Sequence, residues 1–320
     1  MGRARAMDKP IATAAPGATP EAVLAARVAA LAKGYSLEVS SRSARDLDAC
    51  LTHLEKGSDV YINFVAGDDL GAKVRCAAAL KASGFRPVPH IGARHLTSVA
   101  QLDDLLARLA GEAGVDRALL IAGDAAAPAG PFESSAAVLA GGLLAKHKFR
   151  AAGFAGYPEG HPHIAEAELK RALAEKLKLA AAQGIEPWIV TQFGFEPAAA
   201  VDWLGALRQS GVAIPVRIGL AGPANIATLV RFAIRCGVAN SIRALTALAD
   251  RFLRLVSDSA PDALLRGIAE ASSADAGVLA GVAGLHFFPF GGVAKTARWA
   301  NALKRGRFRI AGSGGLDVEV

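Results

Sequence analysis

Short apolar runs of β type alternate with longer segments of helical periodicity along most of this 320-residue chain. The predicted strands are residues 36–40, 60–64, 87–90, 118–121, 151–156, 188–192, 216–220 and 284–288. The predicted helices between them are residues 43–56, 70–83, 98–109, 133–146, 165–183, 197–209 and 224–236. A lead-in helix at 20–32 precedes the alternation, a helix pair at 245–256 and 261–271 delays the last strand, and residues 293–303 form a final helix.

Eight strands that alternate with helices favour a parallel sheet, and eight is also the number that closes a (β/α)8 barrel. The alternative is an open doubly wound sheet. No G-x-G-x-x-G or G-x-x-x-x-G-K-[ST] motif stands at a strand-to-helix turn, which removes the usual phosphate-binding signatures of open sheets. We therefore predict one (β/α)8 TIM barrel over residues 20–310, with a flexible N-terminal arm at 1–19 and a flexible tail at 311–320.

Composition narrows the class of protein. Hydrophobic residues make up 52% of the chain, yet no apolar run reaches the roughly 18 residues that a membrane span needs. The net charge of +7 is spread along the helices, which disfavours a nucleic-acid groove and suits acidic small ligands. The 3 cysteines have no metal or disulfide spacing, so we expect a reducing, cytoplasmic setting. Whether the chain forms a homo-oligomer stays open.

Polar side chains stand at or just beyond most predicted strand ends. In a barrel, these carboxyl ends meet on the face that carries active sites. The residues concerned are Glu38, Asn63, His90, Asp124, Tyr157, Glu159, His161, Gln192 and His286. Each has an ordinary alternative: Glu38 could be a rim charge, and His90 a hydrogen-bonded core histidine. Together, two carboxylates with imidazole and amide neighbours suit acid and base chemistry on a ring system.

Other chemistries are less well supported. His161 and His163 lie two residues apart, but no cysteine or carboxylate cluster joins them, so a metal site is disfavoured. No G-x-S-x-G motif is present, and Cys76 and Cys236 lie in helical patterns. Nucleophilic acyl transfer is therefore disfavoured as well.

Two motifs carry a family resemblance. The run from Tyr157 to Pro162 reads Y-P-E-G-H-P, and the next predicted strand ends in T-Q-F at Thr191 to Phe193. With Glu38, Gly123-Asp124, Pro223-x-Asn225 and Leu285-His286-Phe287-Phe288, the chain resembles the methylenetetrahydrofolate reductase family over about residues 35–305. It is similar to the short, single-domain form of that family.

The resemblance implies a TIM barrel that binds FAD and uses NADH or NADPH. It would interconvert 5,10-methylenetetrahydrofolate and 5-methyltetrahydrofolate, a reaction of one-carbon metabolism and methionine biosynthesis. Glu38 would be the general acid for the folate bridge nitrogen, with a pKa raised by burial. Asp124 would contact the pterin and tune the flavin, and Gln192 would bind the pterin edge. Thr228 and Phe232 fall in the substrate-binding helix, where Phe232 is either a stacking residue or helix core.

The resemblance also assigns cofactor contacts. These residues are Asn63, His90, Gly123, Asp124, Ser134, Ser135, Tyr157, His161 and Arg171. The sequence departs from the family at Ala122, where an Arg is typical, and in the shifted register of the basic helix after His161. Phe290-Gly291-Gly292 replaces an Asn-Arg pair, Asn63 replaces a Thr, and Thr228 replaces a Gln. Each lost charged phosphate contact would cost about 1.5–3 kcal/mol.

These departures leave alternatives open. One is a flavin-free barrel that binds folate or processes methyltetrahydrofolate. Another is a structural partner subunit, suggested by the basic N-terminal arm.

Overall fold

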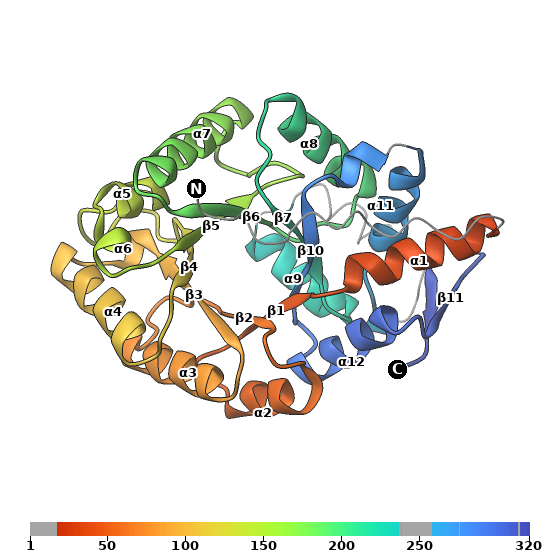
Figure 1. Ribbon diagram of the computed structural model, residues 1–320, viewed down its shortest axis with the longest axis horizontal. Helices are drawn as coiled ribbons and strands as arrows, with labels where there is room; N and C mark the ends of the chain where they lie inside the picture. The colour runs from red at the N-terminus through yellow and green to blue at the C-terminus, as the bar shows by residue number, and fades with distance from the viewer. Residues whose placement is uncertain (1–17, 237, 239–257, 275, 313) are drawn as a thin grey trace, which may run out of the picture. The chain divides into compact units, whose positions relative to one another are not determined.

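A computed structural model describes residues 18–236, 238, 258–274, 276–312 and 314–320, and within them eight parallel strands close a barrel (Figure 1). The strand order around the barrel is β1-β10-β7-β6-β5-β4-β3-β2, so strands that follow one another in the alternation are also neighbours in space. This confirms the predicted (β/α)8 fold.

The barrel strands lie close to their predicted positions. They are β1 (Ser36–Val39), β2 (Asp59–Ile62), β3 (Arg86–Gly92), β4 (Arg117–Ile121), β5 (Ala151–Gly156), β6 (Glu186–Thr191), β7 (Val216–Ala221) and β10 (Val282–Phe288). Two short pairs lie outside the barrel: β8 (Ala224–Asn225) with β9 (Asp258–Ser259), and β11 (Phe308–Ile310) with β12 (Leu316–Val318).

The helices follow the same alternation. They are α1 (Pro20–Ala32), α2 (Ala44–His53), α3 (Leu70–Ala82), α4 (Val99–Gly111), α5 (Ser135–Ala140), α6 (Leu143–Lys146), α7 (Glu166–Ala182), α8 (Pro197–Gln209), α9 (Ile226–Arg235), α11 (Asp262–Ala274) and α12 (Val293–Lys304). Side-chain oxygens of Ser43, Ser98 and Ser134 accept N–H groups at the starts of α2, α4 and α5, which explains where those helices begin. The predicted helix at 245–256 lies outside the described residues.

The structure departs from the sequence prediction most plainly at residues 133–146 and at the C-terminal end. The single helix expected over 133–146 is two short helices, because Gly142 adopts a left-handed φ of 70° between them. The C-terminal residues, expected to be a loose tail, include β12, which pairs antiparallel with β11 and buries Leu316. Side chains alternate between the two faces of β12, so Leu316 is buried. The glycines just before it made this segment resemble a loose tail in the sequence.

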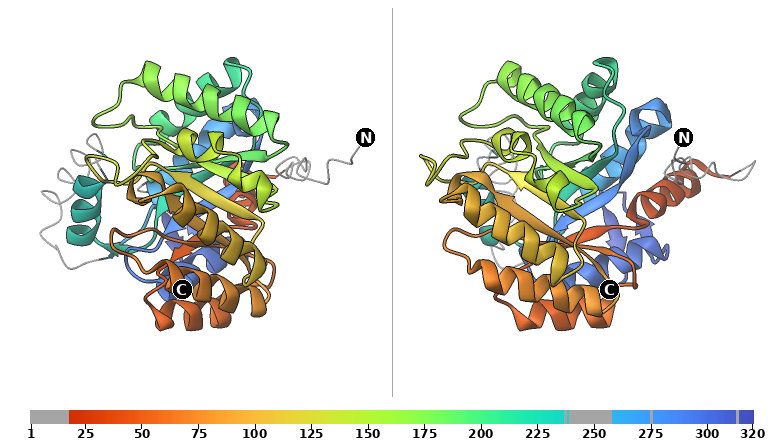
Figure 2. Two further views of the ribbon diagram at one scale, coloured as in Figure 1. Left: turned by 90° about the vertical axis from the view of Figure 1, so that its left-hand side faces the viewer. Right: turned by 60° about the vertical axis from the view of Figure 1, so that its left-hand side comes forward.

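The described residues group into two compact units. The first, here named the Glu38 unit, comprises residues 36–156 and 163–190. Its helices α2 to α7 lie outside the strands, as the views in Figures 1 and 2 show. Tyr61, Val88, Leu119 and Val190 fill its interior with Trp188, whose indole N–H donates to the Tyr61 hydroxyl at 3.0 Å. Gly153 leaves room for this ring, since a Cβ there would lie 2.5 Å from it.

The second, named the Glu159 unit, comprises the described residues within 18–35, 157–162 and 191–320. Its core includes an aromatic cluster in which Phe193 contacts Phe288 and Phe290 at ring-centroid distances of 5.5 and 4.9 Å. The Thr191 hydroxyl accepts the Gly219 N–H at 2.8 Å. This bond holds the end of β6 against β7. The two strands approach so closely there that position 219 has no room for a side chain.

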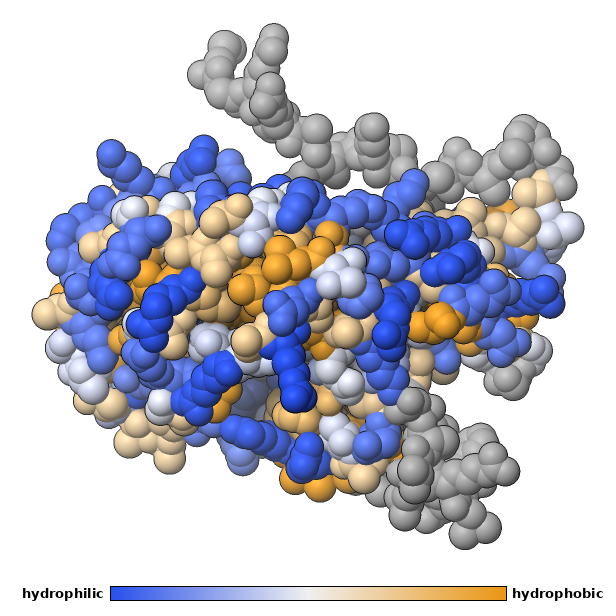
Figure 3. Space-filling model, turned by 90° about the horizontal axis from the view of Figure 1, so that it is seen from below, coloured by the Kyte–Doolittle hydropathy of each residue, from blue (hydrophilic) through white to orange (hydrophobic). Residues whose placement is uncertain are grey.

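Hydrophilic residues cover most of the face shown in Figure 3, with hydrophobic residues in smaller areas between them. Among the described helices, none combines the length and the apolar character that crossing a membrane requires.

Candidate active site

Glu38 is the most deeply placed of the predicted catalytic residues. It lies on β1 with 9% of its surface exposed, and its Oε1 is 3.5 Å from Nε2 of His90 on β3. Burial raises the pKa of the Glu38 carboxyl, and the charges of His90 and Lys73 act in the opposite direction. The site therefore holds a carboxyl group that retains its proton more readily than one in water.

Lys73 is a buried cation that the sequence pattern did not predict as a site residue. It lies on α3 with 0% of its surface exposed. Its Nζ donates to the backbone carbonyl oxygens of Asn63 at 3.1 Å and His90 at 3.0 Å, and lies 5.0 Å from the ring centre of Phe64. Burial lowers the pKa of Lys73 to about 8. One signal was available: Lys73 stands on the buried stripe of α3 with Val74, Ala77 and Leu80.

A cavity of about 130 Å³ is lined by the two histidines that contact the predicted catalytic carboxylates. His90 and His95 both line it, together with Phe64, Lys73 and Asp68. His95 Nε2 lies 2.9 Å from Oδ1 of Asp124, whose side chain is 63% exposed. Glu38 and Asp124 thus each contact an imidazole that lines the same cavity. His95 was also missed, because it lies three residues beyond β3 in a short 3-10 turn.

Gly123 shapes this edge of the cavity. It adopts a φ of 90°, and a Cβ there would lie 2.7 Å from the His95 ring. The glycine of the Gly123-Asp124 pair is therefore required by the chain conformation and by the imidazole beside it.

The other predicted cofactor residues of the Glu38 unit are in different environments. Asn63 Oδ1 is buried and has no hydrogen-bond partner within the described part of the chain. Ser134 caps α5, and Ser135 is buried at its first turn. Arg171 is 72% exposed on α7 and pairs with Glu168 at 2.7 Å, and it does not line the cavity beside His90.

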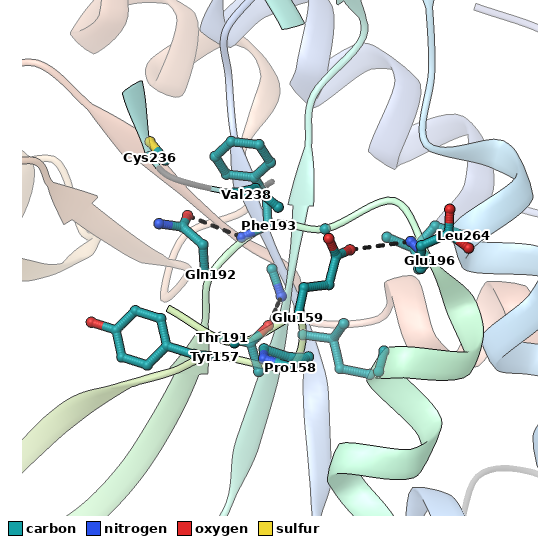
Figure 4. Close-up of a pocket in the computed structure, with 15 residues that line it drawn as sticks. Tyr157, Pro158, Glu159, Thr191, Gln192, Phe193, Glu196, Cys236, Val238 and Leu264 are labelled. Carbon is teal, nitrogen blue, oxygen red and sulfur yellow. Dashed lines mark hydrogen bonds between the residues drawn. The ribbon is translucent and has the colours of Figure 1, made fainter. Parts of the chain in front are cut away.

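In the Glu159 unit, the carboxylate of Glu159 links the Y-P-E segment to the residues that follow T-Q-F. Glu159 Oε1 accepts the backbone N–H groups of Phe195 at 2.7 Å and Glu196 at 3.2 Å, next to the first residue of α8 (Figure 4). A Cβ at Gly194 would collide with that carboxylate, so the position needs glycine. The Glu159 side chain thereby holds the Y-P-E segment to the backbone that follows T-Q-F, at residues 195 and 196.

Gln192 and Tyr157 line a small cavity of about 20 Å³, which is room for about one water molecule. The Gln192 side-chain oxygen accepts the N–H of Phe193 at 3.1 Å, so this amide is held by its own neighbour. The Tyr157 ring stands edge-on to His161 with centroids 5.1 Å apart. Burial raises the pKa of the Tyr157 phenol.

Phe232 and Thr228 lie on α9. Phe232 stacks on Phe290 with centroids 4.1 Å apart and an interplanar angle of 13°, and it packs against the Phe193 cluster. Phe290 covers one face of Phe232. This favours a packing role for Phe232, while its half-buried state leaves part of the ring exposed. The Thr228 N–H bonds to the capping side chain of Asn225 at 2.8 Å.

No family model matches this sequence. The chain is similar to two solved structures at low sequence identity. A GH18 chitinase from Pseudoalteromonas aurantia is 12% identical over 85% of this chain and 99% of its own, with a TM-score of 0.49. A 3-dehydroquinate dehydratase from Aquifex aeolicus VF5 is 10% identical over 69% of this chain and 99% of its own, with a TM-score of 0.38.

Proposed function

We propose that this protein is a flavin-dependent oxidoreductase that interconverts 5,10-methylenetetrahydrofolate and 5-methyltetrahydrofolate with NADH or NADPH. The observation that carries the proposal is the state of Glu38. A reaction at a folate ring nitrogen needs a proton donor, and Glu38 is a buried carboxyl with a raised pKa at the position that the resemblance assigns to the acid.

The neighbours of Glu38 support this role. Nε2 of His90 lies 3.5 Å from Oε1 of Glu38, and burial raises the pKa of the carboxyl, which favours its protonated form. Asp124 pairs with His95, which lines the cavity that His90 also lines, and it stays largely exposed, so it can contact a polar ring edge. The two carboxylates thus have separate environments, which allows separate acid and electrostatic roles.

The residues of the Glu38 unit fit a flavin ring in one respect. The buried Asn63 oxygen has no donor within the described residues, and such an acceptor suits a ring N–H group. Asn63, His90, Gly123 and Asp124 would hold the ring, and Ser134 and Ser135 the ribityl or phosphate part. When bound, the flavin would supply hydride transfer between the nicotinamide and the folate.

The proposal is tested by an absorbance spectrum and by the rate of NADH or NADPH oxidation. Purified protein supplied with FAD is expected to show a bound-flavin absorbance between the near-UV and the blue. It should then oxidise NADH or NADPH in a manner that depends on 5,10-methylenetetrahydrofolate. A protein that binds no flavin and shows no folate-dependent oxidation with either nucleotide would contradict the proposal. Running the assay with 5-methyltetrahydrofolate and an electron acceptor reports the reverse direction.

A second function is a flavin-free barrel that binds folate. The observation that favours it is Arg171, which pairs with Glu168 on the exposed side of α7, together with the uncharged Ala122. Neither residue offers a free charge to a phosphate. Calorimetry that finds tight binding of tetrahydrofolate and none of FAD would support this alternative.

A further inference from the structure

Lys73 has no counterpart among the motif residues, yet it occupies a central position in the Glu38 unit. Its side chain is fully buried, and its ammonium group donates to the carbonyl oxygens of Asn63 and His90. Asn63 directly follows β2, and His90 lies on β3. One cation therefore ties the carboxyl-terminal parts of two adjacent barrel strands.

The buried ammonium group of Lys73 lowers the stability of the fold unless its contacts compensate for lost hydration. Burying an ammonium group carries a large desolvation penalty, which two carbonyl oxygens and the Phe64 ring offset only in part. A methionine or leucine would fill the same volume without that penalty. The cation lies within electrostatic range of Glu38 and contacts the backbone of His90, which is the partner of Glu38.

We propose that Lys73 is a positioning residue, which holds the ends of β2 and β3 together and thereby fixes the His90–Glu38 pair. The inference rests on the proposed function for its effect on catalysis. Lys73 touches no reacting atom in this scheme, and it acts through the backbone of His90 and through its charge.

The titratable groups around the His90–Glu38 pair define the expected pH behaviour. Glu38 faces His90 on β3 and Lys73 on α3, and Lys73 faces Asp68 after β2, Cys76 on its own helix, and Glu38. The ammonium charge lowers the pKa of Glu38, in opposition to burial. Removing that charge must therefore raise the pKa of Glu38, so that the carboxyl keeps its proton to a higher pH.

The experiment compares Lys73→Met with Lys176→Met. Lys176 is the matched control, because it is also a nearly buried lysine, with its Nζ 5.3 Å from the ring centre of Phe154 and a pKa lowered to about 8. The Glu38 carboxyl is titrated by carbon-13 NMR in the ligand-free protein, with Glu38→Gln used to assign its signal. The midpoint is expected to move to higher pH in Lys73→Met and to stay in place in Lys176→Met. Equal midpoints in Lys73→Met and the wild type would overturn the inference.

Turnover supplies the second measurement. Lys73→Met is expected to lower kcat in the folate reaction by about 10–100-fold, since small displacements of a catalytic group cost that much. KM for the folate should change far less, and the alkaline limb of the kcat profile should move to higher pH. A loss of activity that leaves the pH profile unmoved would show a merely structural role and would overturn the inference.

Two outcomes need a further measurement: a Lys73→Met variant that does not fold, and a wild type without folate activity. If Lys73→Met does not fold, nitrogen-15 NMR of the wild-type lysine ammonium groups replaces it: slow proton exchange at Lys73 is expected, and fast exchange overturns the inference. If the wild type has no folate activity, the proposed function fails. The Glu38 titration still decides the role of Lys73, because it needs no substrate.

Discussion

Glu38 and Glu159 both stand at or just beyond predicted strand ends, and the structure gives them opposite environments. Glu38 is buried beside an imidazole and an ammonium group, and its pKa is raised. Glu159 accepts two backbone N–H groups next to the start of α8. The first is suited to hold and release a proton, and the second to hold a loop in place. Glu159 of the Y-P-E segment thus has a structural role in the chain, and Glu38 is the one of the two whose environment suits the proposed acid role.

The largest expected effect separates the two glutamates by activity. Glu38→Gln should lower folate turnover by about 10²–10⁴-fold, because the amide cannot supply the proton. Its free energy of unfolding should change little, since the amide resembles the protonated carboxyl that burial favours. The measurements are kcat and a urea unfolding curve. Glu112→Gln, at an exposed residue paired with Arg108, is the control and should leave both unchanged. Full activity in Glu38→Gln would remove the acid role.

The next effect separates them by stability. Glu159→Ala leaves the N–H groups of Phe195 and Glu196 without their acceptor, so the free energy of unfolding should fall by about 1–3 kcal/mol. Glu168→Ala breaks only an exposed pair with Arg171 and should cost less than about 1 kcal/mol. Urea unfolding of both variants measures the difference. Equal losses would mean that the hydrogen bonds of Glu159 contribute no more than a surface ion pair.

Gly194→Ala tests the same contact from the other side. The new Cβ would meet the Glu159 carboxylate, and the strain should cost about 1–3 kcal/mol of the free energy of unfolding. In the background of Glu159→Ala the cost should shrink, because the colliding group is gone. Gly205→Ala is the control. Gly205 lies within α8, and a Cβ there would have nothing within 4 Å, so the variant should stabilise the protein slightly. Strictly additive effects would contradict a direct contact between residues 194 and 159.

Asp262 is a third carboxyl, and its pKa is raised mainly by burial. Burial, with a contribution from Asp317, raises the pKa of Asp262 to about 7. Its Oδ1 has no hydrogen-bond partner within the described residues. Because the folded-state pKa exceeds the unfolded value, the stabilisation is present below about pH 4 and is lost as pH rises toward 7.

Asp262→Asn should therefore flatten the decline in stability between those pH values, a smaller change than those above. Unfolding curves at several pH values measure it, with Asp317→Asn expected to have a weaker effect in the same direction. An unchanged slope in Asp262→Asn would show that Asp262 is not the group that titrates.

The sequence was sufficient to place the barrel strands, because buried parallel strands appear as short apolar runs between amphipathic helices. The strand-end pattern also singled out Glu38 and Asp124 as candidates, and both contact histidines of one cavity. The break at Gly142 was missed because glycine tolerates helical as well as left-handed backbone. Lys73 and His95 were missed for a different reason. A lysine in a helix and a histidine in a turn acquire meaning only from tertiary neighbours, which periodicity does not report.

The indole of Trp188 offers a practical consequence. Of the 3 tryptophans in the sequence, Trp188 belongs to the Glu38 unit, and Trp203 and Trp299 belong to the Glu159 unit. Replacing the latter two with phenylalanine would leave one fluorophore, bonded to Tyr61 inside the barrel wall. Its emission would follow the melting of that half of the chain separately from circular dichroism of the whole. Coincident curves would mean that the two halves melt as one cooperative body.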